Sequence, residues 1–230
     1  MIKAIVTDIE GTTSALSFVH EVLFPYARAR MAEFVRCHAE DPHVVSHLND
    51  VRLEAGADLS IDEIIAQLIE WIDKDKKITP LKALQGMIWE EGFKQKDFTG
   101  HVYDDAVQNL QRWHAAGMKL YIFSSGSVQA QKLLFGYSDA GDMTPLFSGY
   151  FDTNIGAKRE ASAYTAIASK IGLPPNEILF LSDIEQELDA AKAAGMHTIW
   201  LVRESTPNES AGHRQVQSFD DIELGEQSGL

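Results

Sequence analysis

Short runs of consecutive apolar residues alternate with segments of helical periodicity in the second half of the chain. We expect strands at 120–123, 150–151, 178–181 and 198–202, and helices at 128–135, 161–171 and 185–194, with one more beginning at Asp104. Strands that are apolar throughout and separated by helices are typical of a parallel sheet with helices on both faces. The pattern therefore predicts an α/β fold in this half.

A different pattern occupies the segment before this half. Apolar residues recur at helical spacing over 16–35, and Ser60 and Glu63 have the spacing of a capping box that opens a second helix. Thr79 and the proline after it open a third helix, which Gly92 is expected to end. No run here has the alternation of a strand. We predict an all-helical insert.

The insert divides the chain into two domains. A short apolar strand at 3–7 belongs with the later strands, so residues 1–14 and 100–230 form the α/β core and residues 15–99 form the helical domain. Within the core, residues 203–230 are polar and are expected to be irregular.

Composition excludes several classes of protein. A formal net charge of −14 over 230 residues disfavours a nucleic-acid partner, whose phosphates require a basic surface. No apolar run approaches the ~20 residues of a membrane helix, and the first residues lack the layout of a signal peptide, so no membrane partner is expected. Cys37 is the only cysteine, which excludes an internal disulfide and favours the cytoplasm.

Polar residues follow three of the predicted strands. The first strand ends in Asp8-Ile9-Glu10-Gly11-Thr12-Thr13, the second in Ser124-Ser125-Gly126-Ser127 and another in Ser182-Asp183, and Gly156-Ala157-Lys158 precedes a helix. The carboxyl ends of parallel strands meet at one edge of a sheet, where ligands bind. We therefore expect these carboxylates, hydroxyls and the lysine to share one crevice.

Carboxylates at this edge suit a hard divalent cation. Asp8 and Asp183 provide the oxygen ligands that Mg²⁺ prefers, and the ion would let an anionic phosphate approach Asp8 despite the acidic composition. An oxygen of Asp8 can then attack phosphorus and form an aspartyl phosphate. Glu10, two residues away, can act as general acid and base.

The remaining motifs suit the phosphoryl group itself. Ser124, the backbone of Ser125 and the ammonium of Lys158 can bind its oxygens as charge spreads over them. Each motif alone has a simpler explanation as a helix cap, a loop or a surface lysine. Their shared order and placement at strand ends favour a phosphate site.

The four motifs, taken in order, resemble those of a known superfamily. The order Asp-x-Glu-Gly-Thr, Ser-Ser-Gly, Gly-x-Lys and Ser-Asp resembles the haloacid dehalogenase superfamily of phosphohydrolases. The resemblance implies a Rossmann-like parallel sheet covered by helices on both faces, with the all-helical segment 15–99 as a cap domain inserted after the first motif. Most phosphatases of that superfamily have an aspartate two residues after the nucleophile, where this chain has Glu10.

The glutamate resembles one subfamily, the enolase-phosphatases of methionine salvage. Similarity to that subfamily extends over 20–26, 86–89, 124–136 and 151–153, and so over nearly the whole chain through Arg203. It implies enolisation of 2,3-diketo-5-methylthiopentyl-1-phosphate, followed by its hydrolysis to the acireductone 1,2-dihydroxy-3-keto-5-methylthiopentene through an aspartyl phosphate. It also implies a monomer.

The same resemblance assigns roles to the motif residues. It implies one Mg²⁺ per chain near Asp8, Glu10 and Asp183, catalysis by Asp8, Glu10 and Lys158, and substrate binding by Ser124, Ser125 and Lys158. Whether Glu10 meets the metal through its side chain or its backbone carbonyl stays open.

Other functions also stay open. A generalist magnesium-dependent phosphatase acting on sugar phosphates or other small molecules is the main alternative, followed by a phosphoacceptor signalling module and a metal-free dehalogenase. His43 and His47, spaced four apart, suggest a second metal site only weakly, because no carboxylate cluster accompanies them. His20 could face the substrate or pack within the helical domain.

Overall fold

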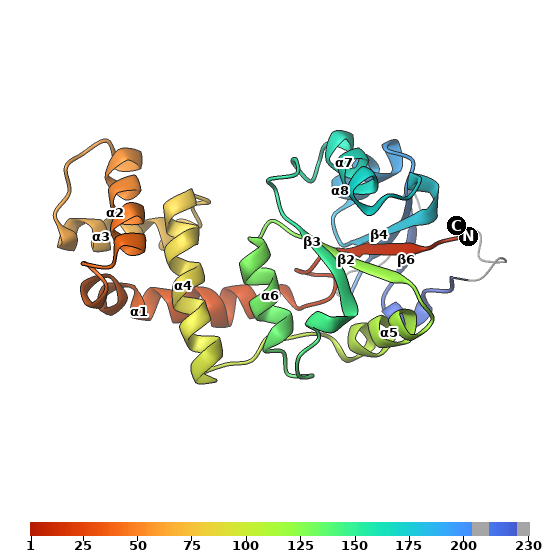
Figure 1. The fold of residues 1–230 in the computed structure, drawn as a ribbon, viewed down its shortest axis with the longest axis horizontal. Coiled ribbons are helices and arrows are strands. Elements are labelled where there is room, and N and C mark those ends of the chain that lie inside the picture. The colour runs from red at the N-terminus through yellow and green to blue at the C-terminus, as the bar shows by residue number, and fades with distance from the viewer. Residues whose placement is uncertain (204–211, 225–230) are drawn as a thin grey trace. The chain divides into compact units, whose positions relative to one another are not determined.

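The computed structural model describes residues 1–203 and 212–224, which form two compact units (Figure 1). One unit joins Met1–Leu16 to the chain from Gly100 onward, and the other consists of Ser17–Thr99. Among the described residues, no helix has the length and apolar character needed to cross a membrane.

The first unit is built on one sheet in which all described strand pairs are parallel. Its strands are β1 (Ala4–Thr7), β2 (Lys119–Phe123), β3 (Phe147–Phe151), β4 (Ile178–Ser182), β5 (His197–Leu201) and β6 (Arg214–Val216), in the order β3-β2-β1-β4-β5-β6. The helices between them are α5 (Asp104–Ala115), α6 (Val128–Gly136), α7 (Ala161–Ile171) and α8 (Glu185–Ala193). The predicted Rossmann-like α/β fold is confirmed.

Helices lie on both faces of this sheet. In Figure 1, α7 and α8 lie above the strands and α5 lies below them. Alternate residues of the central strands, such as Val6 and Phe180, share a fully buried cluster with Tyr164 of α7 and Leu188 of α8. Burial on both faces explains why these strands are apolar throughout.

Tyr164 also connects this core to the chain segment before α7. Its ring packs edge-on against Phe123 and Phe180, and its hydroxyl donates to the backbone carbonyl of Lys158 at 2.7 Å. Burial raises the pKa of this phenol above its usual range, so the hydroxyl keeps its proton as a donor. The core therefore fixes the position from which the Lys158 side chain extends.

The second unit is entirely helical, as the pattern predicts. A π-helical segment, Phe18–Leu23, leads into α1 (Phe24–Cys37), followed by α2 (Pro42–Ala55), α3 (Ile61–Asp73) and α4 (Thr79–Gln95). The capping box of Ser60 and Glu63 is present at the start of α3. The apolar pattern did not predict α2 or the π-helical turns, where the Leu23 carbonyl accepts a hydrogen bond from the Trp89 indole at 2.8 Å.

One predicted helix end is wrong. Helix α4 continues through Gly92 to Gln95, and the left-handed residue that follows it is Lys96, with φ of 62°. A Cβ at Gly92 would collide with the rings of Tyr26 and Phe98. The glycine therefore allows aromatic rings to pack closely against the helix, and does not end it.

The predicted irregular tail, residues 203–230, is also wrong in part. Residues 214–216 form β6, which pairs with β5 at the edge of the sheet. Such a short edge strand has too few residues to show alternation. Residues 204–211 and 225–230 of that prediction lie outside the described residues.

Candidate active site

The three central strands end beside one another. In the sheet, Thr7 of β1 lies between Ile122 of β2 and Leu181 of β4, so the residues after each strand emerge at the same edge. Asp8, Ser124 and Asp183 all follow these strands within two residues. The sheet therefore brings together residues that are far apart in sequence.

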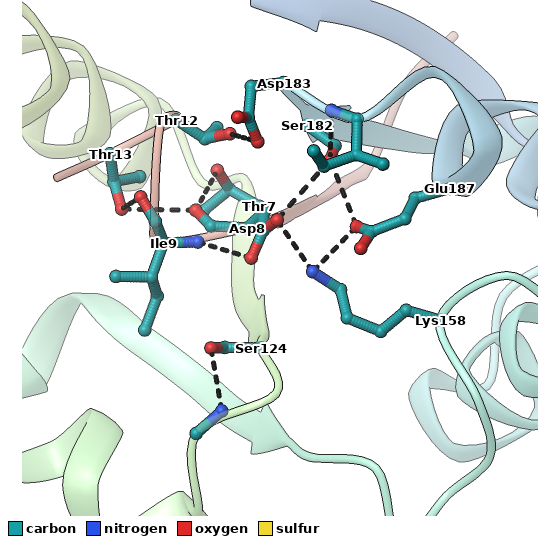
Figure 2. Close-up of polar contacts among 12 residues, drawn as sticks. Thr7, Asp8, Ile9, Thr12, Thr13, Ser124, Lys158, Ser182, Asp183 and Glu187 are labelled. Atoms are coloured by element: carbon teal, nitrogen blue, oxygen red, sulfur yellow. Dashed lines mark hydrogen bonds and ion pairs between the residues drawn. The ribbon is translucent and has the colours of Figure 1, made fainter. Parts of the chain in front are cut away.

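A buried lysine connects two carboxylates at this edge. The Lys158 Nζ lies 2.7 Å from Asp8 Oδ2 and 2.7 Å from Glu187 Oε2, and the three side chains are 7%, 7% and 10% exposed (Figure 2). The Ser182 hydroxyl lies 3.1 Å from Glu187 Oε2 and 3.4 Å from Asp8 Oδ2. The four side chains form one buried, hydrogen-bonded cluster with a single ammonium at its centre.

The charges of this cluster shift the pKa values of its members. Burial disfavours the ammonium of Lys158, but Asp8 and Glu187 outweigh it, so its pKa lies above the usual value. Burial, and next the charge of Asp8, raise the pKa of Glu187 to about 7. Lys158 is thus a permanent cation, while Glu187 can gain or lose a proton near neutral pH.

The loop after β1 is tightly bonded to Asp8. The Ile9 amide donates to Asp8 Oδ1 at 2.7 Å, and the Thr13 hydroxyl donates to the Asp8 carbonyl at 3.1 Å. Gly11 has φ of +69°, and a Cβ there would collide with the carboxylate of Asp183. Glycine is required at this turn because of both its conformation and the closeness of Asp183.

Asp183 is the second carboxylate beside Asp8. The Thr12 hydroxyl approaches its Oδ1 at 3.5 Å (Figure 2). The Trp200 indole donates to the Asp183 backbone carbonyl at 2.9 Å. Burial, and next the negative charge of Asp8, raise the pKa of Asp183 to about 6. Two carboxylates that repel each other in this way form a place where a cation is favoured.

The donors fit a magnesium ion better than a metal that needs a full protein cage. Among the described residues, no group of three or more His, Cys, Asp or Glu side chains is arranged to hold a metal, and this includes His43 and His47. Mg²⁺ commonly takes only one or two carboxylates and completes its shell with water and substrate oxygens. Asp8 and Asp183 match that requirement, with Glu10 exposed nearby on the same loop.

The loop after β2 lies at the same edge. Its Ser124 hydroxyl accepts a hydrogen bond from the Gly126 amide at 3.1 Å, and Ser127 caps α6 by accepting from the Ala130 amide. Gln131 donates from its amide nitrogen to the carbonyls of Gly126 and Phe151, at 2.8 and 2.9 Å. The loop that carries Ser124 and Ser125 is therefore fastened to β3 and ends at a helix N-terminus, which favours anions.

Sequence reasoning gave no role to Glu187 or Gln131. Both are buried polar side chains on helices whose other buried residues are apolar. In the sequence, Glu187 shares a helical face with Leu188 and Ala191, and a charged residue on an apolar face is rarely buried without a partner. That signal could have identified Glu187, although not its pairing with Lys158.

Comparisons of the sequence and of the structure with known proteins point to the same family. A family model described as haloacid dehalogenase-like hydrolase matches residues 2–195. Enolase-phosphatase E1 of Methylococcus capsulatus is 64% identical over 224 residues, covering 96% of this chain and 98% of that protein, and its counterpart in Serratia proteamaculans is 58% identical over 227 residues, covering 98% and 99%. The crystal structure of the UTR4 protein of Saccharomyces cerevisiae matches with a TM-score of 0.82 at 32% identity, covering 96% of this chain and all of that one.

Proposed function

Because the chain belongs to the haloacid dehalogenase-like hydrolases, and within them to the enolase-phosphatases, we propose that it acts on 2,3-diketo-5-methylthiopentyl-1-phosphate. It enolises this compound and then hydrolyses the phosphate ester, which leaves the acireductone 1,2-dihydroxy-3-keto-5-methylthiopentene and phosphate. The observation that carries the proposal is the buried cluster of Asp8, Lys158 and Glu187 beside Asp183.

Enzymes of this family are generally magnesium-dependent, and the site suits one such ion per chain. Asp8 and Asp183 would hold it, together with Glu10 through either its side chain or its backbone carbonyl. When bound, Mg²⁺ supplies positive charge that offsets the carboxylates and draws the phosphate dianion towards Asp8.

Asp8 acts as the nucleophile. One of its carboxylate oxygens bonds to phosphorus while the bond from phosphorus to the ester oxygen breaks, and Glu10 gives that oxygen a proton. A water molecule then attacks phosphorus, Glu10 takes its proton, and phosphate leaves as the Asp8 carboxylate is restored. The Ile9 amide and the Thr13 hydroxyl hold Asp8 in one orientation for both steps.

Lys158 stabilises the charge that spreads over the phosphoryl oxygens. It already contacts Asp8 Oδ2, so its ammonium lies where the transferred group arrives. Glu187 keeps this ammonium charged and in place when Asp8 loses its own charge on phosphorylation. Ser124 and Ser125 complete the set of donors at the end of β2.

Glu10 is suited to the enolisation step. Its side chain is exposed, whereas Asp8 is buried, and it is one methylene longer than the aspartate found at this position in most related phosphatases. We attribute to this reach the movement of a proton between substrate carbon and oxygen.

The test follows the two steps separately. The protein is incubated with the diketo phosphate and Mg²⁺ while enediol absorbance and free phosphate are recorded. As a control, a chelator should stop the release of phosphate, and excess Mg²⁺ should restore it. Enediol appearing before phosphate supports the proposal. Phosphate release with no enediol, together with rapid hydrolysis of unrelated sugar phosphates, would instead support a generalist phosphatase.

The partners of this activity are limited to the small phosphate ester and the ion. We propose that the protein works as a monomer in the cytoplasm, without nucleic acid or membrane. A single species of 25.5 kDa in size-exclusion chromatography with light scattering would support the monomer.

A further inference from the structure

Arg203 follows β5 and binds the loop that bonds to both proposed metal ligands, Asp8 and Asp183. Its Nε donates to the Thr12 carbonyl at 2.7 Å, and its Nη1 lies 3.0 and 3.1 Å from the two oxygens of Asp105. The side chains of Arg203 and Asp105 are 10% and 16% exposed. This is a largely buried contact, unlike an ordinary surface ion pair.

Aromatic rings and further donors immobilise this pair. The guanidinium carbon of Arg203 lies 3.9 Å from the centre of the Tyr103 ring and 5.2 Å from that of Phe219. Asp105 also accepts hydrogen bonds from the Phe219 amide at 2.7 Å and the Ser218 hydroxyl at 2.9 Å. Nη2 of Arg203 has no hydrogen-bond partner among the described residues, so Nε, Nη1 and the two rings hold the guanidinium in place. A side chain held in this way can act as a fixed support.

The supported loop forms hydrogen bonds with both Asp8 and Asp183. The Tyr103 amide donates to the Thr13 carbonyl at 2.9 Å, so Arg203 and Tyr103 hold two consecutive carbonyls of the loop. Thr12 is completely buried and directs its hydroxyl at Asp183, while Thr13 directs its hydroxyl at the Asp8 carbonyl. A shift of this loop would change both carboxylates together.

We propose that Arg203, held by Asp105, is a positioning residue that fixes the Thr12–Thr13 loop and thereby tunes the affinity of the Asp8–Asp183 site for Mg²⁺. Arg203 has no contact with either carboxylate among its described bonds, so it acts through Thr12. The role rests on the proposed function, because it requires that site to bind the ion. Groups that orient metal ligands from outside commonly change affinity by about 10- to 100-fold.

The test is Arg203→Lys, which keeps the charge but cannot bond to the Thr12 carbonyl and to both oxygens of Asp105 while stacking on Tyr103. Mg²⁺ binding is measured by calorimetry without substrate, next to the Mg²⁺ dependence of phosphate release. We expect the dissociation constant for Mg²⁺ to rise about 10-fold or more, with kcat recovering towards the parent value at saturating Mg²⁺.

The matched control is Arg28→Lys. Arg28 also bonds to both oxygens of an aspartate, donating from Nε and Nη2 to Asp73 in the helical unit at 2.6 and 2.9 Å, but both side chains are about half exposed. We expect this control to leave Mg²⁺ binding unchanged. A folded Arg203→Lys protein with the parent dissociation constant would overturn the proposal.

Asp105→Asn provides an independent test. It removes the charge that holds Arg203 but nearly preserves the shape, and we expect weaker Mg²⁺ binding in the same direction. The double variant should bind Mg²⁺ no more weakly than Arg203→Lys alone, because both changes release the same loop. Failure of both single variants to fold would also contradict a positioning role, and a parent protein that binds no Mg²⁺ would contradict the proposed function itself.

Discussion

Replacing Lys158 by methionine removes the only ammonium from the buried cluster while keeping a side chain of similar length. In the parent, this ammonium lies 2.7 Å from a carboxylate oxygen of both Asp8 and Glu187. The variant therefore leaves two buried carboxylates facing each other, and it removes a positive donor from the position that the transferred phosphoryl group would take.

This geometry predicts one effect on catalysis and a separate effect on stability. Loss of a preorganised donor to the transition state costs about 2–4 kcal/mol, so we expect kcat to fall about 30- to 1000-fold. Removing one partner of a buried ion pair destabilises a protein by about 3–5 kcal/mol. Glu187 can reduce this second cost by taking a proton, since its pKa is already raised to about 7 in the parent.

The sign of the pH effect on the variant is fixed by that proton. In the folded variant, Glu187 binds a proton more tightly than in the unfolded chain, where the pKa of a glutamate is near its ordinary 4.5. The destabilisation should therefore be largest above pH 8 and should shrink as the pH falls towards 5. Without this dependence, the pairing of Lys158 with Glu187 would not explain the loss of stability.

The assay pairs phosphate release at saturating substrate and Mg²⁺ with urea unfolding at pH 5.5 and pH 8.5. Lys3→Met is the control, because Lys3 forms an ion pair with Glu177 at 2.8 Å that is partly exposed and lies at the opposite ends of β1 and β4 from the site. It should alter neither quantity by much. A Lys158→Met protein that keeps the parent kcat would refute the assignment of this lysine to catalysis.

The remaining predictions concern four single positions. Asp8→Asn should abolish phosphate release with little change in the far-ultraviolet circular dichroism spectrum, because the amide has the same shape but is a poor nucleophile; turnover near the parent rate would show that another group attacks phosphorus. Glu10→Asp should slow enediol formation more than phosphate release from a simple phosphate ester, and equal effects on both rates would make its reach irrelevant. The dissociation constant for Mg²⁺ should rise as the pH falls from 7 to 5, because the ion must displace a proton from Asp183, whose pKa is about 6. If calorimetry finds the same dissociation constant across this range, Asp183 is not a ligand. Gly92→Ala should lower the free energy of unfolding by about 1–3 kcal/mol in a urea titration despite the better helix propensity of alanine, because two aromatic rings occupy the space of its methyl group; an increase in stability would show that the rings move away at little cost.

The central strands, and the polar residues that follow them, were predictable because their sequence signals are local. Each central strand is a continuous apolar run, and each run is followed directly by polar residues such as Asp8 or Asp183. Parallel pairing then places these residues at one edge without any knowledge of side-chain contacts. Helix α7 was predicted at its observed bounds because Gly172 adopts the left-handed conformation that ends it.

The end of α4 and the partners of Glu187 and Arg203 were not predictable, because they depend on contacts between residues that are distant in sequence. The close approach of aromatic rings to Gly92 is made by segments distant in sequence, so the same residue type that ends other helices lies inside this one. Likewise, Glu187 and Arg203 acquire their partners only when the sheet forms. Their sequence neighbours gave no indication of which residue each would bind.

The central position of β1 has a consequence for the synthesis of the protein. Asp8, the proposed nucleophile, is translated 174 residues before Ser182, and Thr12 is translated 191 residues before Arg203, although both pairs are in contact in the folded chain. A ribosome-bound fragment thus carries Asp8 long before the residues that would activate it have emerged. We therefore expect no phosphate release from a partly synthesised chain, and pairing over such long separations is expected to make its folding slow.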